Sequence, residues 1–302
     1  MRPPRLRALA TAASLLVALL LGVACDAERS AHGNARPATL RFSAIPDQSS
    51  TELREKFDRV AAYLERRLGV PVSYQPAADY AASVEMFRHG DVLLAWFGGL
   101  THLQAVDAVP GARAIAQGEE DRAFTTTFVA HRDTGLAKSA EFPREIADFP
   151  FAFGAESSTS GRLMPEHYLR RETGLDAQRF FQHALVFSGS HDKTLALVAA
   201  GNLKCGAVSS AVYEASVSAG KIDPELVRAI WVTPPFPDYN FTAHPELETR
   251  FGAGFTAKLT AALLEMDEPA LLAAFPRRRL VAAQNSDFEP LRSIARDLGL
   301  LR

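Results

Sequence analysis

The sequence predicts an α/β protein with two lobes. Its 302 residues are more than one hydrophobic core usually supports, because single cores stop growing near about 250–300 residues. Strand-like and helix-like segments alternate along most of the chain, a pattern typical of covered, mostly parallel sheets. The segment 234–237, Pro-Pro-Phe-Pro, interrupts this alternation. A composition of 47% hydrophobic and 23% charged residues excludes a disordered chain and a polytopic membrane protein.

Residues 1–24 have the layout of a secretory signal peptide. Three arginines precede an apolar run over 8–24, which is shorter than the roughly 20 residues of a membrane span. Small residues before Cys25 are typical of a bacterial lipobox, so we expect Cys25 to carry a lipid; a plainly cleaved signal is the alternative. The polar segment 25–38 is predicted to tether the domain to the membrane, which the protein would contact only through this anchor. Cys205 has no partner and is expected to be buried.

Apolar periodicity predicts the elements that follow. In the first set, strands are expected at 40–45, 70–74, 92–96, 112–116 and 126–130, and helices at 49–68, 80–87 and from the Gly98-Gly99 pair to 106. In the second set, strands are expected at 151–153, 183–187, 205–208 and 227–232, and helices at 159–171, 191–200 and 210–219. The last part is expected to hold helices and no strand, at 246–264, 269–275 and 288–298.

This order of elements predicts a discontinuous first lobe. Lobe 1 would comprise 39–130 plus 234–302, and lobe 2 would be the inserted segment 131–233. The chain would cross between them near Thr127 and near Tyr239. Two crossing segments form a hinge, and the cleft between two lobes is the natural place for a ligand.

A run of hydroxyl residues between strand 151–153 and the next helix predicts an anion site. Helix N-termini leave backbone N–H groups without partners and carry partial positive charge. Such a helix start can cradle an anion, although a serine-rich cap that serves only the helix is the alternative. Arg162 opposes the helix dipole, so it either helps to hold the ligand or pairs with Glu156. The predicted cradle consists of Ser157, Ser158, Thr159, Ser160 and Gly161.

Three more polar or glycine-rich helix starts follow predicted strands. Open α/β sheets bind ligands at the carboxyl ends of their strands, so all four helix starts are expected to face the cleft. His191 has the alternative of a capping or solvated histidine, and Tyr239 either reaches the cleft or packs the hinge. The further candidates for ligand binding are Gln48, Trp96, Phe97, Gly98, His191, Asp192 and Tyr239.

Catalytic and cofactor chemistry find little support in the sequence. The chain has no Gly-x-Ser-x-Gly elbow, no Walker loop and no His-Glu-x-x-His motif. Its eight histidines lack metal-ligand spacing. A net charge of −2 without a basic block argues against nucleic-acid binding. We therefore expect a protein that binds a small molecule, that is not an enzyme, and that uses no metal or cofactor.

Four segments together resemble a known family. They are 43–48 (SAIPDQ), 96–101 (WFGGLT), 156–165 (ESSTSGRLMP) and 188–194 (SGSHDKT). They look like the phosphate/phosphite/phosphonate class of ABC-transporter solute-binding proteins, and in particular the branch often labelled selenate-binding. The resemblance covers about 40–298. It implies a periplasmic-binding-protein fold of the second type, with Ser158, Thr159 and Ser160 at the oxyanion-binding helix start.

The resemblance implies capture of a small oxyanion and its delivery to permease subunits in the inner membrane. The ligand class would be phosphonate, phosphite, phosphate, arsenate or selenate. A binding protein that signals instead to a membrane histidine kinase is the alternative function. Glu156 and Asp192 add a physical criterion, because an ionised carboxylate accepts hydrogen bonds but donates none. If either carboxylate faces the cleft, protonated oxyanions should be preferred over selenate.

Overall fold

The computed structural model describes residues 38–48 and 50–302, with the side chains of Ser50 and Glu52 left out. The predicted signal peptide, the predicted lipidation site Cys25 and nearly all of the predicted tether lie outside these residues. Two β-sheets organise the described part of the chain. Within that part no helix is long and apolar enough to cross a membrane.

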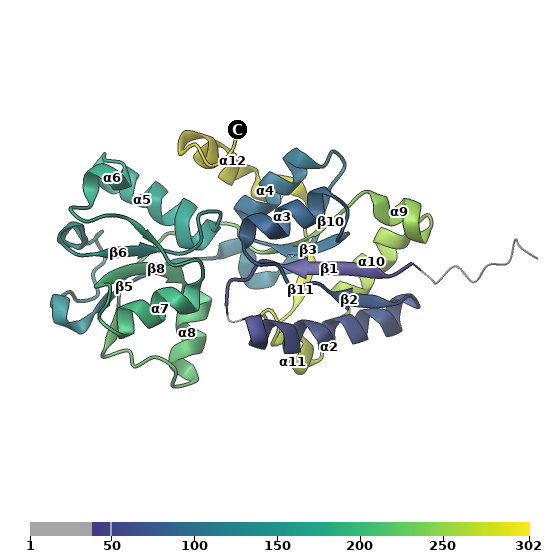
Figure 1. Ribbon diagram of the computed structural model, residues 1–302, viewed down its shortest axis with the longest axis horizontal. Helices are drawn as coiled ribbons and strands as arrows, with labels where there is room; N and C mark the ends of the chain where they lie inside the picture. The colour runs from purple at the N-terminus through teal and green to yellow at the C-terminus, as the bar shows by residue number, and fades with distance from the viewer. Residues whose placement is uncertain (1–37, 49) are drawn as a thin grey trace, which may run out of the picture. The chain divides into compact units, whose positions relative to one another are not determined.

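The first sheet has the strand order β11-β4-β10-β3-β1-β2. Helices α2 and α11 lie on one side of it, and α3 and α4 lie on the other (Figure 1). Its strands are β1 (Leu40–Ala44), β2 (Val72–Tyr74), β3 (Leu94–Phe97), β4 (Arg113–Gly118), β10 (Asn240–Ala243) and β11 (Leu280–Ala282). Its helices are α2 (Ser50–Leu68), α3 (Tyr80–Arg88), α4 (Gly99–Ala108), α9 (Glu246–Phe251), α10 (Phe255–Leu264), α11 (Pro269–Leu272) and α12 (Glu289–Asp297).

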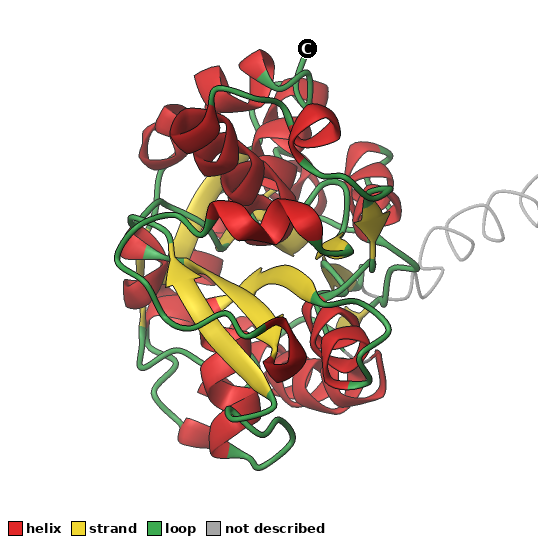
Figure 2. Cartoon of the chain, turned by 90° about the vertical axis from the view of Figure 1, so that its left-hand side faces the viewer, coloured by secondary structure: helices red, strands yellow, loops and turns green. Residues whose placement is uncertain are grey.

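The second sheet has the order β7-β6-β8-β5-β9. Figure 2 turns this lobe toward the viewer and shows its strands between layers of helices. Its strands are β5 (Thr126–His131), β6 (Phe151–Phe153), β7 (Val186–Phe187), β8 (Cys205–Ser209) and β9 (Val227–Val232). Its helices are α5 (Met164–Thr173), α6 (Ala177–Phe180), α7 (His191–Ala199) and α8 (Ser210–Ser218), with a π-helical turn η5 (Thr159–Leu163) before α5. Short 3₁₀ turns lie at Glu119–Ala123 (η2), Arg132–Thr134 (η3), Arg144–Asp148 (η4) and Asn285–Phe288 (η6).

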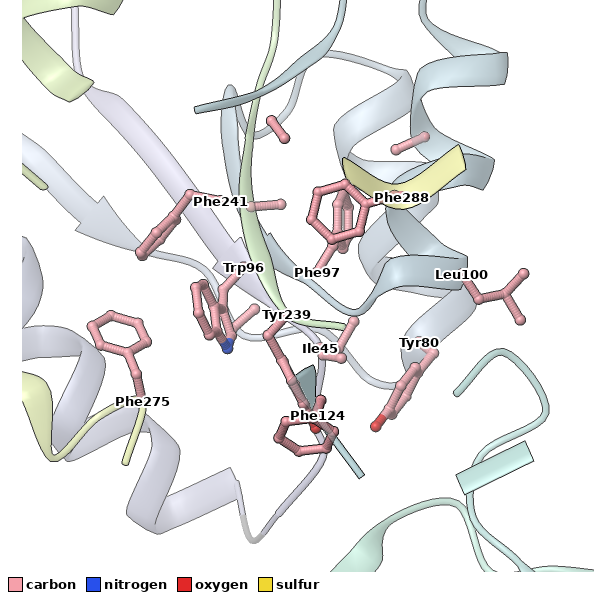
Figure 3. Packing of buried hydrophobic residues seen from close by; sticks show 14 of the residues in the cluster. Ile45, Tyr80, Trp96, Phe97, Leu100, Phe124, Tyr239, Phe241, Phe275 and Phe288 are labelled. Atoms are coloured by element: carbon pink, nitrogen blue, oxygen red, sulfur yellow. The ribbon is translucent and has the colours of Figure 1, made fainter. Parts of the chain in front are cut away.

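An aromatic cluster fills the first lobe beneath the ends of its central strands. Trp96 at the end of β3 stacks on Tyr239, with ring centroids 5.7 Å apart. Phe241 and Phe275 pack against the same indole at 4.9 and 4.8 Å. Figure 3 shows this group, with the hydroxyls of Tyr239 and Tyr80 both directed toward the lower centre of the view. Such rings bury large apolar areas, so the cluster gives the site a rigid floor.

The sheets are mixed, so the expectation of mostly parallel sheets was wrong. Strands β1, β2 and β3 pair in parallel, whereas β10 pairs antiparallel with both β3 and β4. Likewise β5 pairs antiparallel with both β8 and β9. The physical reason is the crossing of the chain, because β5 and β10 each enter a sheet directly from the other lobe.

Strand pairing also moves the first crossing. Residues 126–130 were expected to close lobe 1, but β5 lies inside the second sheet. The chain therefore leaves the first sheet through η2 and returns along the segment after β9, where Phe124 and Phe236 pair as an isolated bridge. Strand β11 was not expected at all. It has three residues and pairs with β4 at the sheet edge, with Leu280 opposite Gly118.

Candidate functional site

The starts of α4 and η5 meet across the lobes. Leu100 N–H of α4 donates to Thr159 Oγ1 at 2.9 Å, and Gly99 N–H donates to Asp238 Oδ1 at 3.0 Å. Gly98 lies between them, and a Cβ built on it would come within 3.0 Å of Asp238 Oδ1 and 3.1 Å of Thr159 Oγ1. Two of the four predicted helix starts are therefore in direct contact.

The predicted cradle forms a tight buried turn. Ser158 caps it, because its Oγ accepts from Gly161 N–H at 2.9 Å. Ser158, Thr159 and Ser160 are each at most 2% exposed. In the part of the chain that the structure describes, the N–H groups of Thr159 and Ser160 donate to no backbone carbonyl. Helix starts leave such donors available, so two backbone N–H groups remain for an anion.

The other two helix starts also meet across the lobes. His191 N–H at the start of α7 donates to the Asp47 carbonyl at 3.0 Å. The His191 ring is fully buried, and its Nδ1 accepts from Ser209 N–H at 3.2 Å. Burial lowers the pKa of His191 to about 4, so the ring is neutral near neutral pH. Because Nδ1 is an acceptor, Nε2 carries the hydrogen. It lies 3.5 Å from Ser160 Oγ and is a donor beside the cradle.

A hydrogen bond joins Asp47 of the first lobe to Tyr239 in the segment that returns from the second lobe. Tyr239 O–H donates to Asp47 Oδ2 at 2.9 Å. Burial raises the pKa of Asp47 to about 6, although the Tyr239 bond opposes the shift. Beside them lies a cavity of about 10 Å³, which is close to the size of one water molecule. Its lining residues are Asp47, Gln48, Leu53, Phe57, Trp96, Ser209, Ala211, Val212, Tyr239, Ala274, Phe275, Pro276 and Arg277.

Two polar groups at the site lack partners among the described residues. They are Asp238 Oδ2 and the Tyr80 hydroxyl. Burial raises the pKa of Asp238 to about 7, despite the opposing bond from Gly99 N–H and the nearby hydroxyls of Thr159 and Ser160. Tyr80 begins α3 and is 3% exposed. A buried polar atom without a partner is costly, so these two groups indicate where a ligand would complete the site.

A buried ion pair lies under the site. Arg277 Nε and Nη2 donate to Asp121 at 2.9 and 2.6 Å, and Nη1 donates to the Phe275 carbonyl at 2.7 Å. The guanidinium also lies 5.2 Å from the ring centres of Phe124 and Tyr239. Burial alone would lower the pKa of Arg277, but Asp121 outweighs it and the pKa is raised. This cation contributes positive field to a region that holds the carboxyls of Asp47 and Asp238.

Several predicted site residues lie elsewhere. Arg162 pairs with Glu166 one turn along, and its guanidinium is 4.8 Å from the Phe153 ring centre. Glu156 is exposed, and together with Arg162 it lines a different groove that also includes Phe187 and Leu300. The ion-pair partner of Arg162 is thus Glu166, and Glu156 acts on the guanidinium only through its charge.

Four more candidates contribute indirectly. Asp192 accepts from Ser190 Oγ at 2.5 Å and lines a groove between α7 and α8. Gln48 borders both that groove and the small cavity. Phe97 is fully buried against Phe87, with ring centroids 5.6 Å apart, so it packs the lobe. Ser157 is half-buried at the start of the turn.

Sequence reasoning missed Tyr80, Asp238 and the Asp121–Arg277 pair. Asp238 carried a usable signal, because a carboxyl directly after 234–237 lies in a crossing that leads to the cleft. Tyr80 follows the helix cap Asp79 and looks like an ordinary apolar face residue. The spacing of Arg162 and Glu166, four residues apart on a helix, also predicts their pairing.

Comparison with known proteins identifies the family. A family model described as the periplasmic substrate-binding protein of phosphonate ABC transporters matches residues 42–288. A probable ABC transporter phosphite-binding protein, PhnD1 of Prochlorococcus marinus, is 34% identical over 273 residues, which are 88% of this chain and 92% of that protein. A phosphate-import protein of Mycolicibacterium smegmatis is 29% identical over 237 residues, covering 74% and 72%.

Solved structures agree with this family assignment. The structure of Prochlorococcus marinus PhnD1 in complex with methylphosphonate has a TM-score of 0.83 at 34% identity, covering 88% of this chain and 100% of that one. A binding-protein component of a Pseudomonas aeruginosa phosphonate transporter shares the fold, with a TM-score of 0.75 at 19% identity over 85% of each chain. The predicted two-lobed α/β fold is confirmed. The chain belongs to the periplasmic substrate-binding proteins of phosphonate ABC transporters, a family of transport components rather than enzymes.

Proposed function

We propose that the protein captures a small phosphorus oxyanion that keeps a hydrogen on one oxygen, the class of phosphite and methylphosphonate, for an ABC importer. One observation carries this proposal. Asp238 presents a buried carboxyl oxygen without a partner beside a helix start that offers donors to an anion. A single ligand with both acceptor oxygens and an O–H group would satisfy both halves of the site.

The donors suit the acceptor oxygens of a tetrahedral anion. The backbone N–H groups of Thr159 and Ser160, the Ser160 hydroxyl and His191 Nε2–H converge at one turn. The Tyr80 hydroxyl is a further donor without a partner. Hydrogen bonds to a charged group contribute about 1.5–3 kcal/mol each, so such a set supports tight binding without a cationic side chain in contact with the anion.

Asp238 supports the choice among oxyanions. Above its pKa of about 7, Asp238 is a carboxylate. An oxyanion that keeps an O–H can then donate to it, whereas selenate and sulfate carry no such hydrogen. A fully ionised anion would meet the carboxylate as a like charge, at a cost of about 1 kcal/mol at 4 Å even in water and several times more in a buried site. The similar protein PhnD1 of Prochlorococcus marinus is consistent with this class, since it is described as a probable phosphite-binding protein and its solved structure holds methylphosphonate.

Competition calorimetry at about pH 8, above the pKa of Asp238, tests the proposal. Phosphite or methylphosphonate should bind and should not be displaced by equimolar selenate. In Asp238→Asn, an amide N–H₂ replaces the unpartnered oxygen, so methylphosphonate should bind at least about tenfold more weakly while the discrimination against selenate narrows. Asp192→Asn is the matched control, because Asp192 is bonded to Ser190 and lines another groove. Selenate displacing both phosphorus ligands from the parent protein would refute the proposed ligand class.

Transport is the proposed role, with permease subunits of the ABC transporter as the partner. The sensory alternative, docking on a histidine kinase, stays a prediction, and neighbouring permease and ATPase genes or a neighbouring kinase gene would distinguish the two. A lipid anchor at Cys25 also stays a prediction. Mass spectrometry of the mature protein from membranes would detect it.

A further inference from the structure

The N-terminus of α4 receives its caps from outside its own lobe. The residue before this helix is Gly98, which has no side chain with which to cap it. The first backbone N–H groups of a helix have no partner within the helix. Here Gly99 N–H donates to Asp238 in the returning crossing segment, and Leu100 N–H donates to Thr159 of the second lobe, 59 residues away. All of these groups are buried.

The N-terminus of α7 shows the reciprocal arrangement. Ser190 precedes the helix, but its side chain makes no capping bond. Instead His191 N–H donates to the main-chain carbonyl of Asp47, which belongs to the first lobe. Each lobe therefore satisfies a helix end of the other lobe. Separating the lobes would leave both helix ends to water.

We propose that Thr159 is a latch residue, which holds the first lobe against the second through α4 and is reinforced by the reciprocal cap from Asp47 to α7. The Thr159 hydroxyl has one hydrogen, and its oxygen already accepts from Leu100 N–H. Its hydrogen is directed to Asp238, whose pKa this bond helps to lower. An oxygen that accepts this hydrogen, of Asp238 or of a ligand, polarises the hydroxyl and strengthens it as an acceptor. Ligand binding and lobe contact thus reinforce each other through one side chain.

The same contact between the lobes explains why position 98 is a glycine. Its backbone has φ −78° and ψ 167°, which any residue adopts, so its own conformation does not require glycine. The requirement comes from the contact between lobes, because a Cβ at this position would meet Asp238 Oδ1 at 3.0 Å and Thr159 Oγ1 at 3.1 Å. Alanine at this position should act as a wedge between the lobes without removing any polar group.

The experiment compares three variants by lobe distance and by ligand kinetics. Thr159→Val removes the hydroxyl at equal size, Thr159→Ser keeps it, and Gly98→Ala adds the wedge. Labels at Ala62→Cys in α2 and Ala215→Cys in α8, both exposed, report the separation of the lobes. The exported chain carries Cys25→Ser, so that it takes no label there, and Cys205 is buried. Methylphosphonate is the probe, measured by double electron–electron resonance and by stopped flow.

If Thr159 is a latch, the distances between the two labels should shift toward longer values in both Thr159→Val and Gly98→Ala. This shift should be seen with and without saturating methylphosphonate. Dissociation of methylphosphonate should be roughly tenfold faster or more in both variants, while Thr159→Ser stays within about threefold of the parent. A threonine that only contacts ligand would change the affinity in Thr159→Val but leave the distances without ligand unchanged. Distances equal to the parent in both Thr159→Val and Gly98→Ala would overturn the latch.

The ligand-bound arm of this test rests on the proposed function, and the arm without ligand does not. If methylphosphonate and phosphite fail to bind the parent protein, the proposed ligand class fails. The latch is then decided by the distances alone. The latch is supported if the fraction of molecules with a short distance between the labels is larger in the parent than in Gly98→Ala. Equal fractions reject the latch.

Discussion

Asp238 should make the stability of the protein depend on pH. Its pKa is about 7 in the folded chain against an ordinary value of 3.8, mainly because burial penalises the charged form. Folding therefore retains a proton on this carboxyl that the unfolded chain releases as the pH rises from about 4. The stability is fully present below the unfolded pKa and is lost as the pH rises toward the folded pKa. Replacement by asparagine should remove this pH dependence, because an amide does not titrate in this range. The amide oxygen can still accept from Gly99 N–H, so the bond to the α4 start is kept.

The magnitude follows from the size of the shift. A shift of about 3 pKa units corresponds to about 4 kcal/mol of unfolding free energy over the whole window. Part of this is already lost near pH 5, which leaves about 2.5 kcal/mol to be lost between about pH 5 and about pH 8. Asp47 shifts in the same direction, with a pKa of about 6. The informative quantity is therefore the difference between parent and Asp238→Asn, in which the contribution of Asp47 cancels.

Urea denaturation at the two pH values, followed by fluorescence and circular dichroism, measures this difference. The stability of Asp238→Asn relative to the parent should rise by about 2.5 kcal/mol from the lower to the higher pH. Asp192→Asn serves as the control for loss of a carboxylate, because Asp192 is half-exposed and bonded to Ser190. A constant difference between parent and Asp238→Asn would show that burial does not hold a proton on Asp238, and the reasoning would then be wrong.

Two further predictions concern the supporting structure. Arg277→Met should destabilise the protein by about 3–5 kcal/mol in urea denaturation, because it leaves the buried Asp121 carboxylate without its cation. Arg278→Ala breaks only an exposed pair with Glu120, so its effect on stability should be much smaller. Equal effects of the two substitutions would contradict this. Burial raises the pKa of the Cys205 thiol to about 12, so native protein should resist iodoacetamide near neutral pH while urea-unfolded protein is alkylated, as mass spectrometry would detect. Rapid alkylation of native protein would refute that burial.

Local periodicity made most elements predictable, and pairing made the rest unpredictable. The helix expected at 49–68 corresponds to α2, Ser50–Leu68, because its apolar face repeats over many turns. Three-residue β11 has no period to detect and exists only through its pairing with β4. The placement of β5 in the second sheet likewise depends on β8 and β9. Which strands pair is a property of the whole fold, so a local pattern does not contain it.

The residues of the site likewise fall into those that a local sequence pattern predicts and those that it does not. Four polar helix starts were recognisable because each depends on a short run of hydroxyls or glycines after a strand. The structure brings them together in pairs, Thr159 with the start of α4 and Asp47 with the start of α7. Tyr80 and Asp238 come from segments without such a pattern, and they reach the site because the chain folds back on itself. Helix starts near the strand ends are thus readable in sequence, whereas side chains delivered by other elements are not.

The same distinction explains which carboxyl group can select a protonated oxyanion. The sequence suggested Glu156 and Asp192 as the acidic groups that would select a protonated oxyanion. Glu156 is exposed and Asp192 is bonded to Ser190, so neither acts on the cradle directly. Asp238 instead has the required properties, since it is buried and touches the α4 start, with one oxygen unpartnered. Selection of a protonated ligand needs a desolvated acceptor beside the donors, and Asp238 is such an acceptor once it ionises above its pKa of about 7. The criterion therefore applies at a residue that only the tertiary structure reveals.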